Sequence, residues 1–346
     1  MLLLSTNFVL TKDVTCNGRQ SRCGGDEFRP APAARERERE ENHHPRPRSE
    51  ASPPRPATAR ALPTTPHTPN TMGSAYSFCS QSVSPDDESF SGKRVVITGA
   101  TSGIGLLLAK RLAASGATVV GWGRNEEAIA SVREEAEERG WNLSMTRCDV
   151  SSKEEISASA ARVLDSLGGV DVLVNNAGVT SGGKWITDLT DEEICRSVDV
   201  NLLAHFWTVR AFLPAMLQQN SGHIVTVSSV AGIMGVAGLS DYCASKFGAF
   251  GLAESLRFEL SKIDSRVSTT IVCPSYIDNG MGKEADIKCR TIFPLMNEDY
   301  VVRRVMGAIV RKQALVILPA TIKTTYLARM YPVSVYDRVV KTWANV

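Results

Sequence analysis

From Lys93 onward, short runs of β-branched residues alternate with longer stretches in which apolar residues recur at helical spacing. Seven such runs, bounded by Gly, Asn, Asp, Ser or Pro, predict strands: RVVITG, ATVVGW, NLSMTRCDV, VDVLVNNAG, HIVTVSS, VSTTIVCP and ALVILP. Helices are expected between them, near residues 103–115, 125–139, 152–167, 191–219, 240–262 and 298–312. Because strands that alternate with helices need right-handed crossovers, the pattern predicts a doubly wound α/β domain, a Rossmann-type parallel sheet of about seven strands with helices on both faces.

The first part of the chain, residues 1 to about 90, lacks this pattern. It is dominated by Pro, Arg, Ser, Thr and Glu, so it cannot bury enough apolar surface to offset its ordering entropy, and we expect it to be disordered. The adjacent His43 and His44 are interpreted as solvated linker residues. The stretch MGSAYS, starting at Met72, has the form of an N-myristoylation signal that would act only if translation began there or the preceding segment were removed.

Composition narrows the class of protein. The 346 residues carry a formal net charge of +2, and outside the N-terminal region basic residues are spread among acids, so no nucleic-acid partner is indicated. Eight cysteines at irregular spacing form neither a disulfide framework nor a zinc pattern, which favours a reducing compartment and no metal site. No apolar run reaches the roughly 18 to 20 residues of a membrane span. We therefore expect a soluble globular protein.

The turn after the first predicted strand carries candidate chemistry. In VVITGATSGIG, Gly99, Gly103 and Gly105 join that strand to the first helix. Glycines here let the backbone approach a pyrophosphate, while the following helix offers its N-terminal N–H groups. A glycine-rich turn between strand and helix at the head of an α/β repeat predicts a dinucleotide site, and the alternative is a tight turn without a ligand.

The stretch LSDYCASKFG places Tyr242 four residues ahead of Lys246. Residues at this separation lie on the same side of a helix, so the ammonium would favour the ionised phenol. A free tyrosine, with a pKa near 10, is a poor base at neutral pH, and such a neighbour makes it usable. By itself the spacing is also typical of a solvated helix face. Only other motifs in the chain can decide between a catalytic pair and such a face.

These motifs, in this order, resemble the short-chain dehydrogenase/reductase family over about residues 91 to 280. The family pattern Thr-Gly-x-x-x-Gly-x-Gly is matched from Thr98 to Gly105, and NNAG, residues 175–178, matches the segment that stabilises the sheet and lines the cofactor. Asp149 corresponds to the residue that contacts adenine. The resemblance implies an oxidoreductase that transfers a hydride between an alcohol carbon and a nicotinamide cofactor.

The resemblance also implies four catalytic residues. Tyr242 would exchange the hydroxyl proton, Lys246 would favour its phenolate, and Ser229, thirteen residues before Tyr242, would hold the substrate oxygen. Its neighbour Ser228 is the less favoured candidate for that role. Asn201 would hold a water that links Lys246 to solvent. His205, one turn further on, is interpreted as a packed helix histidine and not as a base.

Cofactor choice is predicted from the end of the second strand. Gly123 stands where an acidic residue would bind the ribose hydroxyls, and Arg124 follows, so NADP is expected, with NAD as the second choice. The alternative is that Arg124 only caps the strand or points to solvent. The full set of expected cofactor contacts is Thr98, Gly99, Ser102, Gly103, Ile104, Gly105, Arg124, Asp149, Asn176, Tyr242, Lys246, Pro274, Ile277 and Asn279.

The chain departs from the family pattern after its sixth predicted strand. In CPSYIDNGM, Ser275 replaces the usual glycine, and Asn279 stands at the position of a threonine that contacts the nicotinamide carboxamide. Residues 280–298 resemble a loop that covers the substrate, with an ordinary connector as the alternative. Its apolar candidates are Ile292, Phe293, Leu295 and Met296.

Within the family, the chain looks most like the hydroxysteroid and retinol dehydrogenases. That likeness implies a small lipophilic alcohol or carbonyl substrate, a homodimer, and a cytoplasmic protein peripheral to the endoplasmic reticulum or to lipid droplets. The tail, residues 320–346, mixes apolar and basic residues, and it could lie on a membrane, pack on the domain or form a subunit contact.

The sequence thus predicts three regions: a disordered segment at 1–90, a dinucleotide-binding catalytic domain at 91–319 and an amphipathic tail at 320–346. A protein of another class, a cofactor-binding scaffold or redox sensor that has lost catalysis, is the alternative. The joint presence of Asn201, Ser229, Tyr242 and Lys246 argues against it.

Overall fold

The computed structural model describes residues 90–278 and 294–344, which belong to one unit of the chain, Ala75–Val346. The segment predicted to be disordered lies almost wholly outside the described residues. The same holds for the MGSAYS stretch and for three candidate site residues, Asn279, Ile292 and Phe293.

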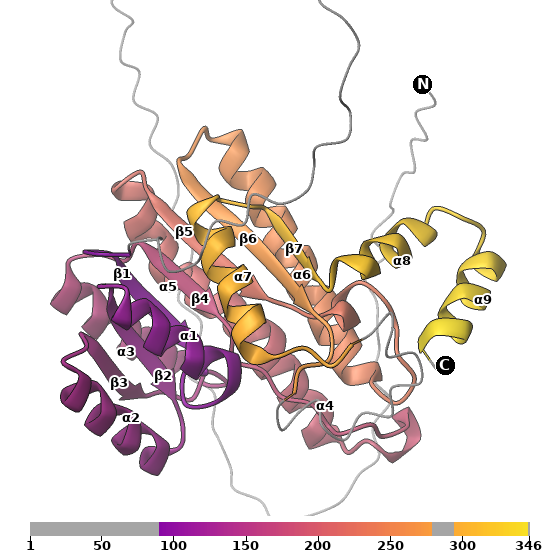
Figure 1. Ribbon diagram of the computed structural model, residues 1–346, viewed down its shortest axis with the longest axis horizontal. Helices are drawn as coiled ribbons and strands as arrows, with labels where there is room; N and C mark the ends of the chain where they lie inside the picture. The colour runs from indigo at the N-terminus through magenta and orange to yellow at the C-terminus, as the bar shows by residue number, and fades with distance from the viewer. Residues whose placement is uncertain (1–89, 279–293, 345–346) are drawn as a thin grey trace, which may run out of the picture. The chain divides into compact units, whose positions relative to one another are not determined.

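A single parallel sheet of seven strands organises the described residues, in the order β3-β2-β1-β4-β5-β6-β7 (Figure 1). The strands are β1 (Arg94–Thr98), β2 (Thr118–Gly123), β3 (Leu143–Arg147), β4 (Val172–Asn175), β5 (Gly222–Val227), β6 (Val267–Pro274) and β7 (Leu315–Leu318). The helices are α1 (Gly103–Ala114), α2 (Glu126–Arg139), α3 (Lys153–Leu167), α4 (Asp191–Val198), α5 (Ala204–Gln218), α6 (Ser240–Lys262), α7 (Glu298–Val310), α8 (Lys323–Ala328) and α9 (Val333–Ala344). The predicted doubly wound α/β fold is confirmed.

Helices cover both faces of the sheet because alternate strand residues point to opposite sides. In β1, Val95 and Ile97 pack in the core formed with α1, α2 and α7, whereas Val96 packs in the core formed with α3, α5 and α6. Figure 1 shows α1 beside α7, on the face opposite α5. Burial on both faces explains why these strands read as unbroken apolar runs.

Local capping residues explain where α2 and α3 begin and end. Asn125 and Ser152 accept hydrogen bonds from the first-turn N–H groups of α2 and α3. Gly140 and Gly168 end the two helices in the left-handed conformation, which costs glycine little.

The helix predicted over residues 191–219 is interrupted by a π-helical turn. The turn η3 (Asp199–Leu203) joins α4 to α5 and carries Asn201. Such turns occur frequently at functional sites. Together the three segments, Asp191–Gln218, are long and apolar enough to cross a membrane by length and composition, although they contain no unbroken apolar run. Forty-four per cent of the most apolar window is buried, and α5 packs on α3, so this helix belongs to the core of the sheet-and-helix fold.

The strand order reverses between β1 and β4. From β1 the chain builds outward to β2 and β3, and from β4 it builds the other way, so the carboxyl ends of β1 and β4 meet at a crevice. This is the place where open α/β sheets bind ligands. The glycine-rich turn follows β1, and the NNAG segment begins in β4.

The predicted tail forms η5 (Ala320–Ile322), α8 and α9, and part of it packs on the domain. Ile322 and Val340 are buried in a core cluster with Val230, Ile233 and Met234. The Arg329 guanidinium lies 4.9 Å from the ring centroid of Phe247 on α6 and 5.6 Å from that of Tyr336 on α9. Other tail residues are exposed, among them Tyr326, Leu327, Met330, Tyr331, Val333 and Val335.

We predict that Phe212→Ala strongly destabilises the domain. Phe212 is fully buried, and its ring centroid lies 5.8 Å from that of Trp122. Removing a buried aromatic ring typically costs about 3 to 5 kcal/mol. Phe206→Ala on the same helix is the control, because Phe206 is 39% exposed. Denaturant unfolding of both variants checks this, and an equal loss of stability in the two would contradict it.

Candidate active site

The glycine-rich turn is held by a hydrogen-bonded bridge between β1 and β4. Thr98 Oγ1 accepts hydrogen bonds from the backbone N–H groups of Asn176 and Ala177, both 3.0 Å. Asn176 Nδ2 in turn donates to the carbonyl oxygens of Thr98 and Gly99, at 3.0 and 3.2 Å. The side chain of Asn176 therefore supports the turn, and the predicted cofactor contacts Thr98, Gly99 and Asn176 lie together.

Two of the glycines have no room for a side chain. A Cβ on Gly105 would lie 2.2 Å from the carbonyl oxygen of Gly99 and 2.4 Å from Asn176 Nδ2. A Cβ on Gly99 would lie 2.8 Å from the Ala177 Cα, and its φ of +68° is left-handed. Both glycines are thus required by the close approach of the turn to the segment after β4.

The first turn of α1 suits an anion. Ser102, at the N-cap, makes no side-chain capping hydrogen bond, and the first turn contains no acidic residue. The backbone N–H groups that begin at Gly103 are the donors that a helix start leaves without intrahelical partners. Ile104 instead packs into the core. A glycine-lined helix start with these donors fits the pyrophosphate of a dinucleotide.

Arg124 and Asp149 lie beside each other at the ends of β2 and β3. The two side chains approach within 3.7 Å, from Nη1 to Oδ2. Burial favours the neutral form of Asp149, but hydrogen bonds from Ser151 and the nearby Arg124 outweigh it and hold the pKa of Asp149 below its usual value. The space beside Gly123 is filled by Thr101, since a Cβ on Gly123 would lie 2.3 Å from Thr101 Cγ2.

On the other side of the crevice, β6 ends at Pro274, and the segment after it carries Ile277. The Pro274 carbonyl accepts a hydrogen bond of 3.3 Å from Ser229 Oγ. Ile277 pairs with Met296, and both side chains are buried in the core. Met296 is therefore a core residue and not part of a covering loop, whereas Leu295 is half-buried.

Ser229, Tyr242 and Lys246 gather at the carboxyl edge of β5. Ser229 caps the short turn η4 (Val230–Gly232), and its hydroxyl interacts with the phenol of Tyr242. Lys246 Nζ lies 5.7 Å from the centroid of the Tyr242 ring and donates to the Val227 carbonyl at 3.0 Å. The structure thus brings together three residues that are up to seventeen positions apart in the chain.

Asn201 reaches the same place from η3. Its Oδ1 accepts from the Val179 N–H at 2.8 Å, while its Nδ2 donates to the Val179 carbonyl at 2.9 Å and to Ser245 Oγ at 3.0 Å. A Cβ on Gly178 would lie 3.3 Å from both Asn201 Oδ1 and Lys246 Nζ, so the two groups are close. The predicted role of Asn201, holding a water beside Lys246, stays a prediction.

Burial shifts the titration of the two ionisable groups in opposite directions. It lowers the pKa of Lys246, which is 3% exposed, to about 8. It raises the pKa of Tyr242 to about 12, although the hydrogen bond with Ser229 works against the rise. In the free protein Tyr242 is therefore a neutral phenol at pH 7, which can donate a proton, and additional positive charge is needed before it acts as a base.

Two neighbours of this set have structural contacts. Ser228 Oγ donates to the Lys246 carbonyl at 2.9 Å and is buried, which leaves Ser229 as the serine near the phenol. His205 is 2% exposed, as expected for a packed helix histidine, and burial lowers its pKa to about 3. A neutral imidazole of this kind is not a base at neutral pH.

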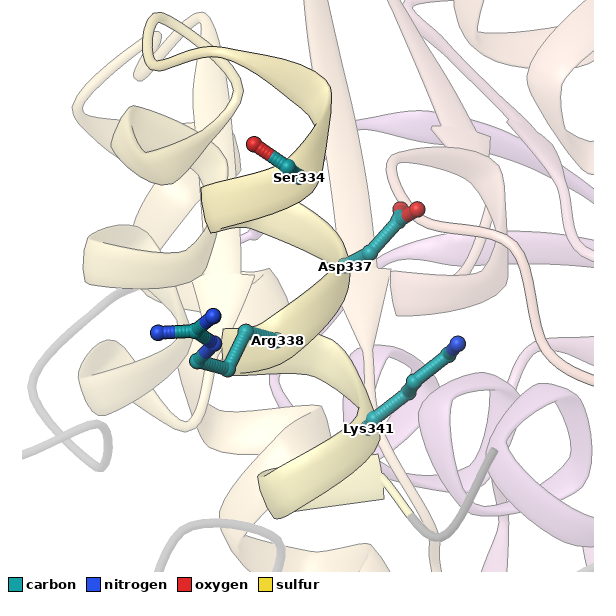
Figure 2. A pocket seen from close by; sticks show the side chains of 4 residues that line it. All are labelled: Ser334, Asp337, Arg338 and Lys341. Atoms are coloured by element: carbon teal, nitrogen blue, oxygen red, sulfur yellow. The ribbon is translucent and has the colours of Figure 1, made fainter.

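A surface recess of about 470 Å³ lies elsewhere, on the tail. It is lined by Ser334, Asp337, Arg338 and Lys341, and Figure 2 shows all four side chains on α9. None of the predicted catalytic residues lines it. Among the described residues, no group of three or more His, Cys, Asp or Glu could hold a metal ion.

Sequence analysis missed Asp241, which binds two serines from other elements beside Tyr242. The available signal was an acidic residue in the otherwise small and apolar stretch LSDYCASKFG. It also missed Thr101, whose contact with Gly123 depends on the fold of the turn.

Comparison with known proteins identifies the class. The family model described as short chain dehydrogenase matches residues 93–289. Short-chain dehydrogenase/reductase family 16C member 6 of Bos taurus is 44% identical over 66% of this chain and 72% of its own length. Epidermal retinol dehydrogenase 2 of Mus musculus is 43% identical over 68% and 77%, and retinol dehydrogenase 10 of Homo sapiens is 40% identical over the same shares.

Solved structures agree with this assignment. A short-chain dehydrogenase/reductase from Burkholderia phymatum in complex with NAD aligns with a TM-score of 0.63 at 27% identity, covering 70% of this chain and 94% of that one. A metagenomic short-chain oxidoreductase in complex with NADP aligns with a TM-score of 0.56 at 33% identity, covering 66% and 97%. The chain belongs to the short-chain dehydrogenase/reductase family and is an enzyme of that family, similar to its retinol dehydrogenases.

We predict that Lys246→Met changes the pH dependence of stability. Because the folded-state pKa of about 8 lies below the usual 10.5, the folded protein binds fewer protons between these values, and wild type gains stability as pH rises through that window. Below pH 8 the buried charge costs up to about 3 kcal/mol. Relative to wild type, the variant should therefore be most stable at pH 7 and lose that advantage by pH 10.

Denaturant unfolding at pH 7, 8.5 and 10 measures this difference. Lys262→Met, at the exposed end of the same helix, is the control and should show a difference from wild type that does not change with pH. A Lys246→Met difference that is equally constant would refute the buried-charge explanation.

Proposed function

We propose that the enzyme interconverts an alcohol and a carbonyl on a lipophilic substrate, with NADP(H) as its hydride partner. Enzymes of this family act on small alcohol or carbonyl substrates, and several similar proteins are named retinol dehydrogenases. The observation that carries the proposal is the meeting of Ser229, Tyr242 and Lys246 at the carboxyl edge of the sheet, beside the glycine-rich turn.

The cofactor would lie along that edge. Its pyrophosphate would lie at Gly99, Ser102, Gly103 and Gly105, with adenosine toward Asp149. The nicotinamide would lie toward Pro274 and Ile277, and Asn279 is the proposed carboxamide partner. When bound, the cofactor supplies the hydride acceptor or donor and, in its oxidised form, a positive charge.

The protein residues supply the proton chemistry. Ser229 would hydrogen-bond the substrate oxygen and hold it beside the phenol of Tyr242, a positioning effect. In the direction of reduction, the neutral phenol would donate its proton to the carbonyl oxygen. In the direction of oxidation, the phenolate would take the hydroxyl proton, and the buried ammonium of Lys246 would favour that phenolate. Asn201 would hold the water through which Lys246 exchanges protons with solvent.

A membrane-peripheral location fits a lipophilic substrate. The exposed apolar residues of α8 and α9 are accompanied by basic ones, including Lys323, Arg329 and Lys341, and such a surface suits anionic lipid headgroups. We place the enzyme in the cytoplasm, peripheral to the endoplasmic reticulum or to lipid droplets. Dimer formation remains a proposal from the family resemblance.

We predict that Tyr242→Phe lowers turnover by about 10² to 10⁴, because it removes the proton donor and acceptor while leaving the ring in place. Oxidation of retinol, a steroid alcohol and a long-chain alcohol is followed through the absorbance of the reduced nicotinamide. Binding of NADPH to the variant, measured by fluorescence, is the control and should match wild type. Full activity of the variant would exclude this role for Tyr242, and a wild type that binds the cofactor yet turns over no substrate would favour the silent scaffold.

We predict that Arg124→Ala raises the KM for NADP(H) at least tenfold and leaves that for NAD(H) almost unchanged. A charge-assisted hydrogen bond to the 2′-phosphate is worth roughly 1.5 to 3 kcal/mol, which corresponds to about ten- to a hundredfold in affinity. Thr101 fills the space beside Gly123 in which an acidic side chain would favour NAD. Arg139→Ala, on α2, is the control and should leave both constants unchanged. Equal efficiency of wild type with the two cofactors would remove the basis for the preference, since the relatives in complex with NAD and with NADP do not choose between them.

A further inference from the structure

Asp241 is a buried carboxylate directly next to Tyr242 in the chain. It lies in the first turn of α6 and is 7% exposed. A buried carboxylate is costly unless hydrogen bonds or an opposite charge compensate it. The start of a helix contributes positive potential, but that alone rarely justifies placing an acid in a core.

The compensation comes from two serines on other elements. Ser181, in the loop after β4, donates to Asp241 Oδ2 at 2.7 Å, and Ser197 on α4 donates to the same oxygen at 2.5 Å. Ser197 is 1% exposed, so this contact is shielded from water. One carboxylate oxygen thus joins three elements at the base of the proposed catalytic tyrosine.

No cation pairs with Asp241 among the described residues. Lys184, three residues after Ser181, instead pairs with Glu193 of α4 at 2.5 Å. The other titratable groups that interact with Asp241 are Glu193 and the Cys243 thiol, and neither is positive. Burial favours the neutral carboxyl, yet the donors, Ser197 first, outweigh it and keep the pKa of Asp241 below its ordinary value.

The loop that Ser181 belongs to runs across the catalytic residues. Gly178 lies against Lys246 Nζ and Asn201 Oδ1. The side chain of Asn201 binds both the N–H and the carbonyl group of Val179. Beyond Ser181, Gly182 and Gly183 are both left-handed, with φ of +78° and +81°, and a Cβ on either would meet no atom within 4 Å. Asn201 therefore fixes the beginning of the 178–181 loop, and Asp241 fixes its end. The two glycines that follow place little restraint on the backbone.

We propose that Asp241 is a positioning residue, whose ionised carboxylate holds the 178–181 loop and α4 against the first turn of α6 and so fixes the substrate side of Tyr242. Loss of that anchor frees the loop at Gly182 and Gly183 and misplaces the substrate oxygen relative to the phenol. The inference rests on the proposed function, because the misplaced step is the proton transfer by Tyr242. The anchoring itself can be measured without turnover.

The first experiment compares Asp241→Asn with wild type. Because misplacement of about 1 Å at a reacting centre can cost a hundredfold, kcat should fall about ten- to a hundredfold. The Kd for NADPH, measured by fluorescence, should stay within about twofold, since Asp241 lies away from the glycine-rich turn. Glu259→Gln, an exposed acid on the same helix, is the matched control and should keep the wild-type kcat. A variant that loses thermal stability but keeps kcat would overturn the proposal, since Asp241 would then be structural only.

The second experiment uses the double variant Ser181→Ala, Ser197→Ala, and stays informative if Asp241→Asn does not fold. The two hydroxyls are the groups through which Asp241 holds the loop and α4, so their removal breaks the anchor while the carboxylate itself stays in place. We expect kcat of the double variant to fall about ten- to a hundredfold, as in Asp241→Asn, with the Kd for NADPH within about twofold of wild type. A double variant that keeps the wild-type kcat would overturn the proposal.

Limited trypsin digestion at Lys184 tests the anchor without catalysis. Cleavage there should be faster than in wild type for both Asp241→Asn and the double serine variant. Equal cleavage rates in all three proteins would show that Asp241 does not hold the loop. If wild type itself turns over no alcohol or carbonyl, the proposed function fails, while the digestion still decides whether the anchor exists.

Discussion

The bridge through Thr98 is the interaction on which the rest of the site depends. Its hydroxyl accepts the Asn176 and Ala177 N–H groups at the reversal of the strand order, where β1 and β4 have no shared loop to hold their ends together. The glycine-rich turn leaves from one side of this bridge and the loop toward Ser181 leaves from the other. Gly99 and Gly105 must lack side chains because the bridge draws the two segments into contact. The proposed dinucleotide site and the proposed catalytic residues thus share one support, and disturbing the bridge would affect both.

Lys246 is a constraint of the opposite kind, because the burial of its ammonium lowers the stability of the fold. Its ammonium is buried with the Val227 carbonyl as its acceptor, and no carboxylate forms an ion pair with it among the described residues. A methionine would fill the same space without the desolvation cost. Such a group fits the proposed catalytic role, in which a poorly solvated ammonium 5.7 Å from the centroid of the Tyr242 ring would favour the phenolate. The burial that raises the pKa of Tyr242 would then also strengthen the effect of Lys246 on it.

Local sequence determines most of the fold but little of the support around the site. All seven strands and the main helices could be predicted, because β-branched runs, capping residues such as Asn125, and glycines such as Gly140 act over a few residues. The resemblance to the family motifs predicted that Ser229, Tyr242 and Lys246 belong to one site. The contact of Thr101 with Gly123, the burial of Met296 and the serine partners of Asp241 could not be predicted, since each joins segments whose approach depends on the whole sheet. The π-helical turn at Asn201 likewise could not be predicted, since the apolar pattern over residues 191–219 indicates one continuous helix.

The C-terminal tail packs on segments next to the candidate site residues, although it carries none of their motifs. Ile322 and Val340 share a core cluster with Val230, Ile233 and Met234, which follow Ser229 directly in the chain. Arg329 lies over the ring of Phe247, which follows Lys246, and over that of Tyr336 on α9. The tail thus packs on the segments that carry the serine and the lysine, whereas the bridge through Thr98 supports the glycine-rich turn and the loop after β4. The exposed apolar and basic residues of the tail are therefore connected through this shared core to the segment after Ser229, and not to the glycine-rich turn.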